Sequence, residues 1–343
     1  MKNKNAVLKI LAELCRLLIG VVFIFSGFVK AVDPMGGAIK IGEYLASFGL
    51  DMLQPFTVLL SFNLSAIEFA LGVCMLLGVY RRYVSFLILI FMAFMTPLTL
   101  YLALFDPVSD CGCFGDALVI SNWETFFKNI VLSLAAIVTF IYNQRLFQCF
   151  TFRAYWFVAL YAYLFGVGFA YYNYNHLPVI DFRPYKIGAN IPKLMEMPEE
   201  APQDEYKYTF VYEKDGVKKE FSLEDYPAND SSWTFVDSKT ELVKKGYQPP
   251  VAAFNIYNGK GDDVTEEIIG NPGPVLLLVA PKLEEADDEQ MDEINGVYDY
   301  ALEHDIPFYC VTGSSPEAID TWSDNTGAEY PFRMADEVLL KTI

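Results

Sequence analysis

The chain has 343 residues, more than half of them apolar, and a formal net charge of −18 at pH 7. The charge is unevenly divided, because residues 1–178 carry a net charge of +2 and residues 179–343 a net charge of −20. The length allows about two domains of about 150 residues each, and the negative excess excludes a nucleic-acid-binding protein because it repels phosphate. The sequence therefore predicts an apolar membrane part joined near residue 178 to an acidic, water-soluble part.

Five apolar stretches are long enough to cross a bilayer, which takes about 20 residues. They comprise residues 8–32, 57–79, 84–105, 124–143 and 154–173. No small-residue cleavage site follows the first stretch, so we interpret it as a retained helix and not as a signal peptide. We expect an all-α membrane bundle of five spans.

Basic residues predict how these spans are oriented. They gather before the first span and in the connections between spans 2 and 3 and between spans 4 and 5, as Lys2, Lys4, Lys9, Arg81, Arg82, Arg145 and Arg153. Lys40 is the only basic residue in the connections 33–56 and 106–123. By the positive-inside rule, we expect a multi-pass protein of the inner (cytoplasmic) membrane with a cytoplasmic N-terminus. Residues 106–123 and the C-terminal domain would then be extracytoplasmic, or periplasmic.

The connection between the first two spans does not have the composition of a plain linker. Apolar residues recur in it at roughly helical spacing, as Ile39, Ile41, Tyr44, Leu45 and Phe48. We therefore expect a short amphipathic or re-entrant helix over the outer mouth of the bundle.

Ionisable residues inside the spans are candidates for a polar site. Glu13, Arg16 and Lys30 lie in the first span and Glu68 in the second. A charge at the bilayer centre costs about 3 kcal/mol or more, so these side chains must face protein or a polar cavity. Glu13 and Arg16 share a helix face and either pair structurally or snorkel towards the cytoplasmic surface. Glu68 either has a structural role or lines a cavity, with Arg16 or Lys30 as its counter-charge.

Two of the six cysteines stand apart from the others. Cys15, Cys74, Cys149 and Cys310 lie in or beside apolar segments, where a lone cysteine is usually a small apolar filler. Cys111 and Cys113 lie in the polar loop DCGCFGD, residues 110–116. An oxidising compartment permits a disulfide there, and a ring closed over one residue is strained and readily reduced.

A redox-active dithiol, a structural disulfide and two inert thiols all remain open for this loop, and the first is favoured. A zinc site is disfavoured because two further ligands are missing. The flanking Asp110 and Asp116 are expected to raise the pKa of the thiols and to disfavour a thiolate. Gly112, Phe114 and Gly115 would shape the loop.

Three motifs together resemble the DoxX/MauE family of membrane proteins over about residues 8–145. They are RLLIGVVFIFSGFVKAVDP at residues 16–34, Glu68 with Gly72, and CGCFGD at residues 111–116. One branch of that family accompanies thiosulfate:quinone oxidoreduction, and another the maturation of a disulfide-rich methylamine dehydrogenase subunit. The second branch is the more similar one.

This resemblance implies a four-helix bundle over residues 1–150, with Cys111 and Cys113 as the redox pair. It also implies that Arg16, Lys30 and Glu68 are polar positions of the bundle. Residues 151–178 depart from the four-helix pattern as a fifth transmembrane helix, which would tether the C-terminal domain.

The acidic part begins with a β-rich connecting segment, residues 179–249. YKYTFVYEKDGVKKEFSL (206–223) predicts a hairpin that turns at Asp215-Gly216, and SSWTFVD (231–237) a further strand. From residue 250, expected strands at 274–281, 307–313 and 330–336 alternate with helices at 284–305 and 315–327. Ser315 is the expected N-cap of the second helix, with Pro316 in its first turn. A last helix is expected to begin at residue 337. The alternation predicts a parallel-type sheet.

This order of elements over residues 250–343 is similar to that of thioredoxin-like domains of the TlpA or peroxiredoxin-like kind. In that family a CxxC motif follows the first central strand, but residues 280–288 (APKLEEADD) contain no cysteine. Acidic residues are instead expected at the helix start, where the helix dipole tolerates them. We expect an incomplete domain that is truncated at its C-terminus.

Two functions remain open from the sequence. The first is a protein of extracytoplasmic thiol/quinone redox metabolism, embedded in the lipid bilayer, whose CxC dithiol exchanges electrons with a thioredoxin-like or client thiol protein. A membrane quinone is the candidate cofactor, and the chain would be a thiol-disulfide or quinone-linked oxidoreductase component. The second is a non-enzymatic membrane-anchored scaffold or maturation factor, whose thioredoxin-like domain binds client proteins.

Overall fold

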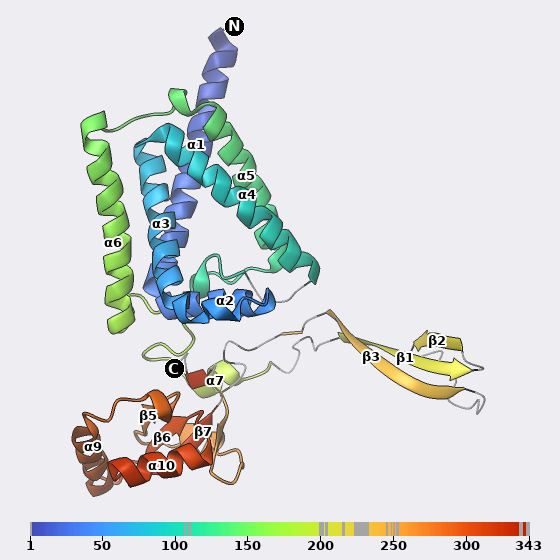
Figure 1. Cartoon of the computed structure of the whole chain (residues 1–343), viewed down its shortest axis with the longest axis vertical. Coiled ribbons are helices and arrows are strands. Elements are labelled where there is room, and N and C mark those ends of the chain that lie inside the picture. Colours follow the sequence, from blue (N-terminus) through green and yellow to red (C-terminus); the bar gives the residue numbers. More distant parts are fainter. Residues whose placement is uncertain are drawn as a thin grey trace. The chain divides into compact units, whose positions relative to one another are not determined.

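The computed structural model divides the chain into two compact units, Met1–Arg183 and Pro184–Ile343 (Figure 1). The residues that it describes are 2–105, 108, 111–198, 202, 205–214, 217–222, 233–244, 246–247, 249, 251, 254–335 and 339–340.

The regular secondary structure described in the first unit is all helical. Its long helices are α1 (Lys2–Val32), α3 (Thr57–Leu77), α4 (Arg81–Phe105), α5 (Asn122–Ile141) and α6 (Tyr155–Asn175), and α2 (Pro34–Ser47) is shorter. Single 3₁₀ segments connect them as η1 (Asp51–Phe56), η2 (Gly115–Ala117), η3 (Asn143–Arg145) and η4 (Phe152–Ala154). All five predicted apolar stretches are therefore helices, and the first begins several residues earlier than expected.

Four of these helical segments are long and apolar enough to cross a membrane. They are Asp51–Leu77, Arg81–Phe105, Asn122–Ile141 and Phe152–Asn175. They identify the chain as a multi-pass membrane protein. Helix α1 is not among the four, and it packs against α3, α5 and α6 in the same bundle. Its crossing of the membrane therefore remains a prediction from the sequence.

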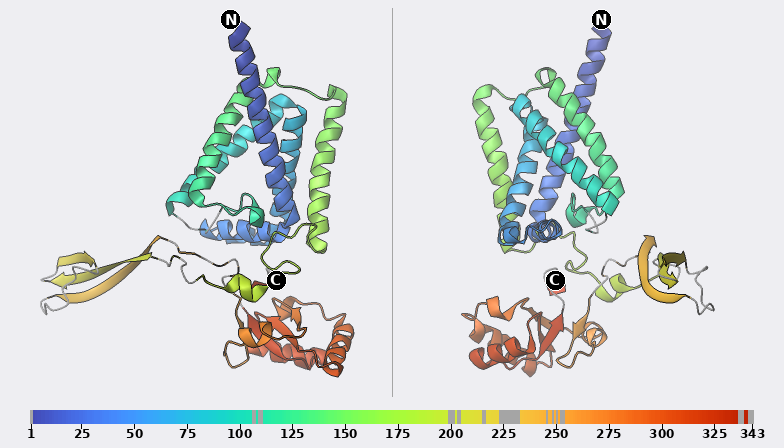
Figure 2. Two further views of the ribbon diagram at one scale, coloured as in Figure 1. Left: turned by 180° about the vertical axis from the view of Figure 1, so that it is seen from behind. Right: turned by 45° about the vertical axis from the view of Figure 1, so that its right-hand side comes forward.

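Helix α2 lies across one end of the bundle, at the end opposite to the N-terminus of the chain (Figures 1 and 2). It begins where Asp33 accepts a hydrogen bond from the backbone of Gly36 at 2.9 Å, with Pro34 in its first turn. Ser61 of α3 donates to the carbonyl of Pro34 at 2.8 Å and fixes the start of α2 to the bundle. The predicted short helix between the first two spans is confirmed.

Glycines bring α1 and α3 into close contact. A Cβ atom on Gly20 would lie 2.5 Å from Cγ of Leu76, and one on Gly72 would lie 2.6 Å from the backbone nitrogen of Ile24. Small residues permit such close backbone approach between membrane helices. The approach places the last turns of α1 directly beside the middle of α3.

The second unit contains two separate sheets. Before the first lies the short helix α7 (Ile191–Met195), and the first sheet has the order β2-β1-β3, all antiparallel. Its strands are β1 (Glu205–Lys214), β2 (Val217–Ser222) and β3 (Thr234–Lys244). The predicted hairpin is thus confirmed, and its turn at Asp215-Gly216 lies outside the described residues. The strand predicted at 231–237 begins at Thr234 and continues to Lys244.

The second sheet has the order β4-β7-β6-β5 and belongs to an α/β region. Its strands are β4 (Ile256–Tyr257), β5 (Leu276–Val279), β6 (Phe308–Thr312) and β7 (Phe332–Ala335). Its helices are α8 (Thr265–Ile269), α9 (Met291–Glu303) and α10 (Pro316–Thr326), with the 3₁₀ turn η5 (Leu283–Glu285). Strands β5, β6 and β7 are parallel, as predicted, and β4 is antiparallel to β7. These strands are compatible with a thioredoxin-like fold.

The helix after β5 differs from its prediction, whereas the next one agrees. Helix α9 begins at Met291 and not at residue 284, because Ser314 holds the preceding segment as a turn: it accepts from the backbone of Leu283 at 2.9 Å and donates to Glu284 at 2.7 Å. The acidic residues 284–288 therefore precede the helix. Ser315 caps α10 as predicted, through the backbone of Ala318. Of the expected last helix, residues 339–340 are helical and the others lie outside the described residues.

Candidate redox site

The loop between α4 and α5 turns on two glycines. Gly112 and Gly115 have φ angles of +63° and +49°, a left-handed conformation that favours glycine. The backbone of Gly115 donates a hydrogen bond to the carbonyl of Gly112 at 3.2 Å and closes the turn. The turn directs both cysteines into the protein, where Cys111 is 6% and Cys113 9% exposed.

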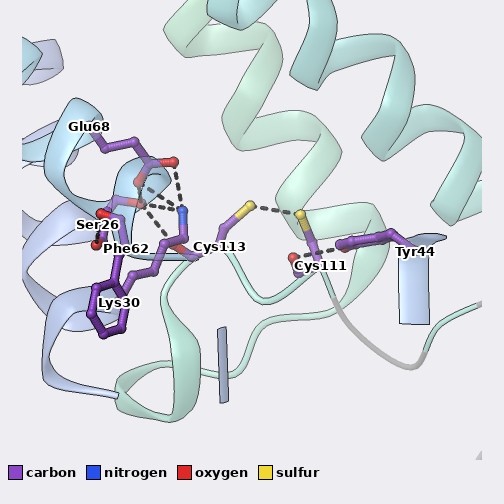
Figure 3. Close-up of polar contacts among 8 residues, drawn as sticks. Ser26, Lys30, Tyr44, Phe62, Glu68, Cys111 and Cys113 are labelled. Carbon is purple, nitrogen blue, oxygen red and sulfur yellow. Dashed lines mark hydrogen bonds and ion pairs between the residues drawn. The ribbon is translucent and has the colours of Figure 1, made fainter. Parts of the chain in front are cut away.

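The two cysteines are free thiols in direct contact. Their Sγ atoms lie 2.7 Å apart, compared with about 2.05 Å in a covalent S–S bond. The phenol of Tyr44, on α2, donates to the carbonyl of Cys111 at 2.8 Å. Figure 3 shows the thiol of Cys113 facing that of Cys111, with Tyr44 beyond Cys111. A small displacement is enough to join the two sulfur atoms.

A buried ion pair lies beside Cys113. The ammonium of Lys30, in the last turn of α1, contacts both carboxylate oxygens of Glu68 on α3, at 2.7 and 2.8 Å. Ser26 Oγ lies 2.7 Å from Glu68 and 2.8 Å from the carbonyl oxygen of Cys113, so it connects the pair to the loop. Of the two counter-charges considered for Glu68, which is only 2% exposed, the structure shows Lys30.

Helix α5 contributes a second cation. Ser121 and Glu124 form a capping box that starts α5, and Lys128 follows about two turns further on. Its ammonium lies 4.1 Å from the centre of the Phe114 ring, a cation–π contact. Phe114 in turn packs edge-on against Phe25 of α1.

A small cavity joins these groups. It measures about 30 Å³, the space of about two water molecules. Its polar lining comprises Ser26, Lys30, Glu68, Cys113, Lys128 and Asn129, and Phe91, Met92 and Met95 are among its apolar residues. Among the described residues, no three histidine, cysteine, aspartate or glutamate side chains gather as metal ligands.

The surroundings of the two thiols make them chemically different. The hydrogen bond from Cys111 and the charges of Lys128 and Lys30 lower the pKa of the Cys113 thiol from 9.0 to about 6, against the opposing effects of burial and Glu68. The same shared hydrogen bond, together with burial, raises the pKa of Cys111. The geometry thus prepares Cys113 to be the thiolate of the pair.

The effect expected from the flanking aspartates is wrong for Cys113. Asp116 is exposed and Asp110 lies outside the described residues, so the charges that face the thiol are the two lysines and Glu68. The aspartates precede and follow the cysteines in the chain, but the fold turns the thiols inward towards α1, α3 and α5.

Glu13 and Arg16 do not belong to this site. Arg16 Nε contacts Glu13 Oε2 at 2.6 Å, and the guanidinium also donates to the carbonyls of Met75 and Leu76 at the end of α3. Glu13 accepts from the backbone of Phe147 at 2.5 Å. These contacts lie at the opposite end of the bundle and join α1 to the last turn of α3 and to the chain that follows α5.

Sequence reasoning brought together Cys111, Cys113, Lys30 and Glu68, but it missed other members of the site. Ser26, Tyr44, Lys128 and Asn129 line or support the site in the structure. A signal for Lys128 was present, because it is a lone cation within the predicted span 124–143. Tyr44 gave no such signal, since its contact is to a backbone carbonyl far along the chain.

Comparisons with known proteins support the assignment of the membrane part. Residues 8–142 match the family model described as methylamine utilisation protein MauE. Residues 206–245, which include β1, β2 and β3, match a model described as a domain of unknown function (DUF8463). No curated protein and no solved structure matches the chain. The family match and the four apolar helices together describe a MauE-like membrane protein.

Proposed function

We propose that this chain is a membrane component of thiol–disulfide exchange, with Cys111 and Cys113 as its redox pair. The observation that carries the proposal is the contact of two free thiols at 2.7 Å beside a cavity that contains two lysine ammonium groups. Structural cysteines that only fill apolar space have no need of cations beside them. The MauE-like character of residues 8–142 agrees with a role in redox maturation of other proteins.

The reaction follows the ordinary course of thiol–disulfide exchange. A thiolate of one partner attacks a sulfur of the other partner's disulfide and forms a mixed disulfide. A second thiol of the attacking protein then resolves it. Two electrons pass between the Cys111–Cys113 pair and the partner, and no metal is needed for the step. The partner is a client or thioredoxin-like protein with a reactive dithiol.

The partner is met outside the cytoplasm in this proposal. The dithiol loop and the C-terminal end of α6 lie at the same end of the bundle, opposite to the N-terminus (Figure 1). The basic residues near the N-terminal end favour a cytoplasmic position for that end. The dithiol and the second unit would then share the extracytoplasmic compartment, in which disulfides persist.

Differential alkylation of the full-length protein in cells tests this function. Free thiols are blocked with one reagent, the protein is reduced, and the released thiols are labelled with a second reagent of different mass. We expect Cys111 and Cys113 to be recovered as a mixture of oxidised and reduced forms that changes with added reductant. A pair that is locked in one form under all conditions would contradict the proposal.

A second candidate function is that of a scaffold, and one observation favours it. The second unit has a single cysteine, Cys310, which is fully buried in β6, and burial raises the pKa of its thiol to about 12. The segment after β5, where a thioredoxin-like protein has its CxxC, has no cysteine. This unit would therefore bind a client without reacting with it. Two variants test this alternative: a deletion of residues 184–343 and the double substitution Cys111→Ser/Cys113→Ser. The scaffold function would be favoured if the deletion abolishes client maturation and the double substitution leaves it intact.

A further inference from the structure

Lys128 leaves the dithiol site with more positive than negative fixed charge. The carboxylate of Glu68 is fully engaged by Lys30, which contacts both of its oxygens. Within the part of the chain that the structure describes, Lys128 has no carboxylate partner, and its ammonium lies over the Phe114 ring. Both lysines and Glu68 line the same cavity as Cys113.

The charge of this cavity depends on the redox state of the cysteines. With Cys113 as a thiolate, the two lysines are balanced by Glu68 and the sulfur. With Cys113 in a disulfide, one positive charge remains unbalanced in a site of low dielectric constant, where an unpaired charge is costly. The fixed charges therefore stabilise the reduced pair relative to the disulfide.

Three further polar or charged side chains of the described residues lie around the loop and do not line the cavity. Lys40 of α2 packs its aliphatic chain against Gly112, and its ammonium pairs with Glu43 at 3.1 Å. Tyr44 donates its phenol hydrogen to a backbone carbonyl. Asp116 is exposed on the loop. Among the described charged residues that line the cavity, Lys128 of α5 is the one beyond the Lys30–Glu68 pair.

We propose that Lys128 stabilises the thiolate of Cys113, and that the Cys111–Cys113 disulfide is therefore an oxidant for reduced dithiols in partner proteins. This inference rests on the proposed exchange function and gives it a direction. A disulfide whose reduced form is stabilised is a strong oxidant. The substrate is accordingly a protein that carries two free thiols, and the product is that protein with a disulfide.

One turnover starts from the disulfide and balances as follows; a two-electron acceptor of the quinone class then re-forms the disulfide from the two thiols. A partner thiolate bonds to Sγ of Cys111, the Cys111–Cys113 bond breaks, and its electron pair stays on Cys113 as a thiolate beside Lys128. The second partner thiol, as a thiolate, attacks the partner sulfur of the mixed disulfide and releases Cys111. The partner loses two electrons and gains an S–S bond. Of its two thiol protons, one ends on Cys111 and one goes to solvent.

The position of the two lysines selects Cys111 as the sulfur that is attacked, because they stabilise Cys113 as the leaving sulfur; both side chains are buried. Attack on a disulfide proceeds in line, from the side opposite to the leaving sulfur. Cys113 lines the buried cavity with the lysines, whereas Cys111 lies on the side of Tyr44 and α2 (Figure 3). The leaving sulfur with the lower pKa also leaves faster.

The test equilibrates the full-length protein in lipid nanodiscs with reduced and oxidised glutathione and measures the fraction of reduced pair. We expect Lys128→Met to shift the equilibrium about tenfold towards the disulfide, about 30 mV for two electrons. The midpoint for alkylation of Cys113 should rise by about one pH unit in the same variant. Lys128→Arg keeps the charge and should remain within threefold of the natural protein. Lys9→Met, at the far end of the bundle, removes an exposed lysine and should have no effect.

Each outcome bears on a different statement. Suppose that the natural pair equilibrates with glutathione. If Lys128→Met then leaves the equilibrium and the titration of Cys113 unchanged, or if Lys128→Arg shifts them as much as Lys128→Met does, the inference on Lys128 is overturned. The proposed exchange function is not affected by either result. If the natural pair does not equilibrate at all, the proposed function itself fails. Acid quench of the oxidised natural protein with reduced glutathione should place the adduct on Cys111, and an adduct on Cys113 would overturn the assignment of the attacked sulfur.

Discussion

The two ends of the membrane bundle both contain buried charges, but they use them differently. At the N-terminal end, Arg16 is paired with Glu13 and its remaining donors reach backbone carbonyls of α3. At the dithiol end, Lys30 is paired with Glu68, and a further cation, Lys128, faces an aromatic ring and a thiol.

A structural charge and a chemically active charge thus differ in the kind of partner they have. A charge whose partners are backbone carbonyls and a carboxylate has its electrostatic demands met in both redox states of the protein. A charge whose partner is an oxidisable sulfur atom has them met in only one redox state. The contacts of Glu13 and Arg16 at the N-terminal end therefore have a structural role: they hold helices together. The dithiol end is a site whose energy changes with redox state.

The largest expected effect comes from removing the oxidisable thiol of Cys113. Cys113→Ser should abolish disulfide formation in the loop and reduce exchange with glutathione to the background, because Cys111 then has no second sulfur. Alkylation followed by mass spectrometry measures both. Cys310→Ala, which removes a buried thiol from the other unit, should leave exchange unaltered. Exchange at the natural rate in Cys113→Ser would remove the dithiol from consideration.

The structural role of the Arg16–Glu13 pair is tested by its effect on stability. Arg16→Met leaves Glu13 without its cation in a largely buried position, which we expect to cost about 3 kcal/mol of unfolding free energy. Denaturant titration in mixed micelles measures this loss. The glutathione equilibrium should stay within threefold of the natural value. Arg82→Met, which replaces an exposed arginine in the first turn of α4, serves as the control with little effect. A large redox shift in Arg16→Met would erase the distinction between the two ends.

The sequence predicted the helices of the bundle more completely than the site between them. Apolar runs and basic connections are local signals, so the five stretches and the short helix over residues 34–47 followed from them. Whether Glu68 meets Arg16 or Lys30 depends on how α1 and α3 slide against each other, which Gly20 and Gly72 determine through backbone contact. No local pattern contains that information.

The dithiol loop also shows what could not be predicted from the sequence. The spacing of Cys111 and Cys113 identified them as a candidate pair, but their chain neighbours suggested a weakened thiolate. The actual neighbours in space are Lys30 and Lys128, on two helices far apart in the sequence. Charge near a thiol is a property of the folded protein, so it could not be derived from adjacent residues.

Removing the carboxylate of the dithiol end should act oppositely to removing its second lysine. Glu68→Gln leaves both lysines unbalanced, so we expect the glutathione equilibrium to move about tenfold towards the reduced pair and the pKa of Cys113 to fall further. Glu43→Gln, which removes the carboxylate of an exposed ion pair with Lys40, is the matched control and should change the equilibrium less than threefold. Shifts of the same sign in Glu68→Gln and Lys128→Met would indicate general loss of structure instead of an electrostatic effect.

The titration of Cys113 gives a pH dependence with a defined sign. Its pKa is lowered from 9.0 to about 6, so between these values the folded reduced protein binds fewer protons than the unfolded chain. Its stability should therefore rise with pH from about 6 to 9 and be lost as the pH falls through 6. Cys111, whose pKa is raised, opposes this only above its ordinary pKa. Denaturant midpoints across this range should show the slope in the reduced protein and not in the disulfide form.

The smallest expected effect concerns α2, which belongs to the dithiol end by position. Tyr44→Phe removes one hydrogen bond to the carbonyl of Cys111, which should cost about 1 kcal/mol of stability. Because that bond carries no net charge and is made in both redox states, the glutathione equilibrium should change less than threefold. A tenfold change would mean that α2 senses the state of the dithiol. The two ends of the bundle would then differ in how strongly their residues are coupled to the redox state of the sulfur atoms, and not in charge alone.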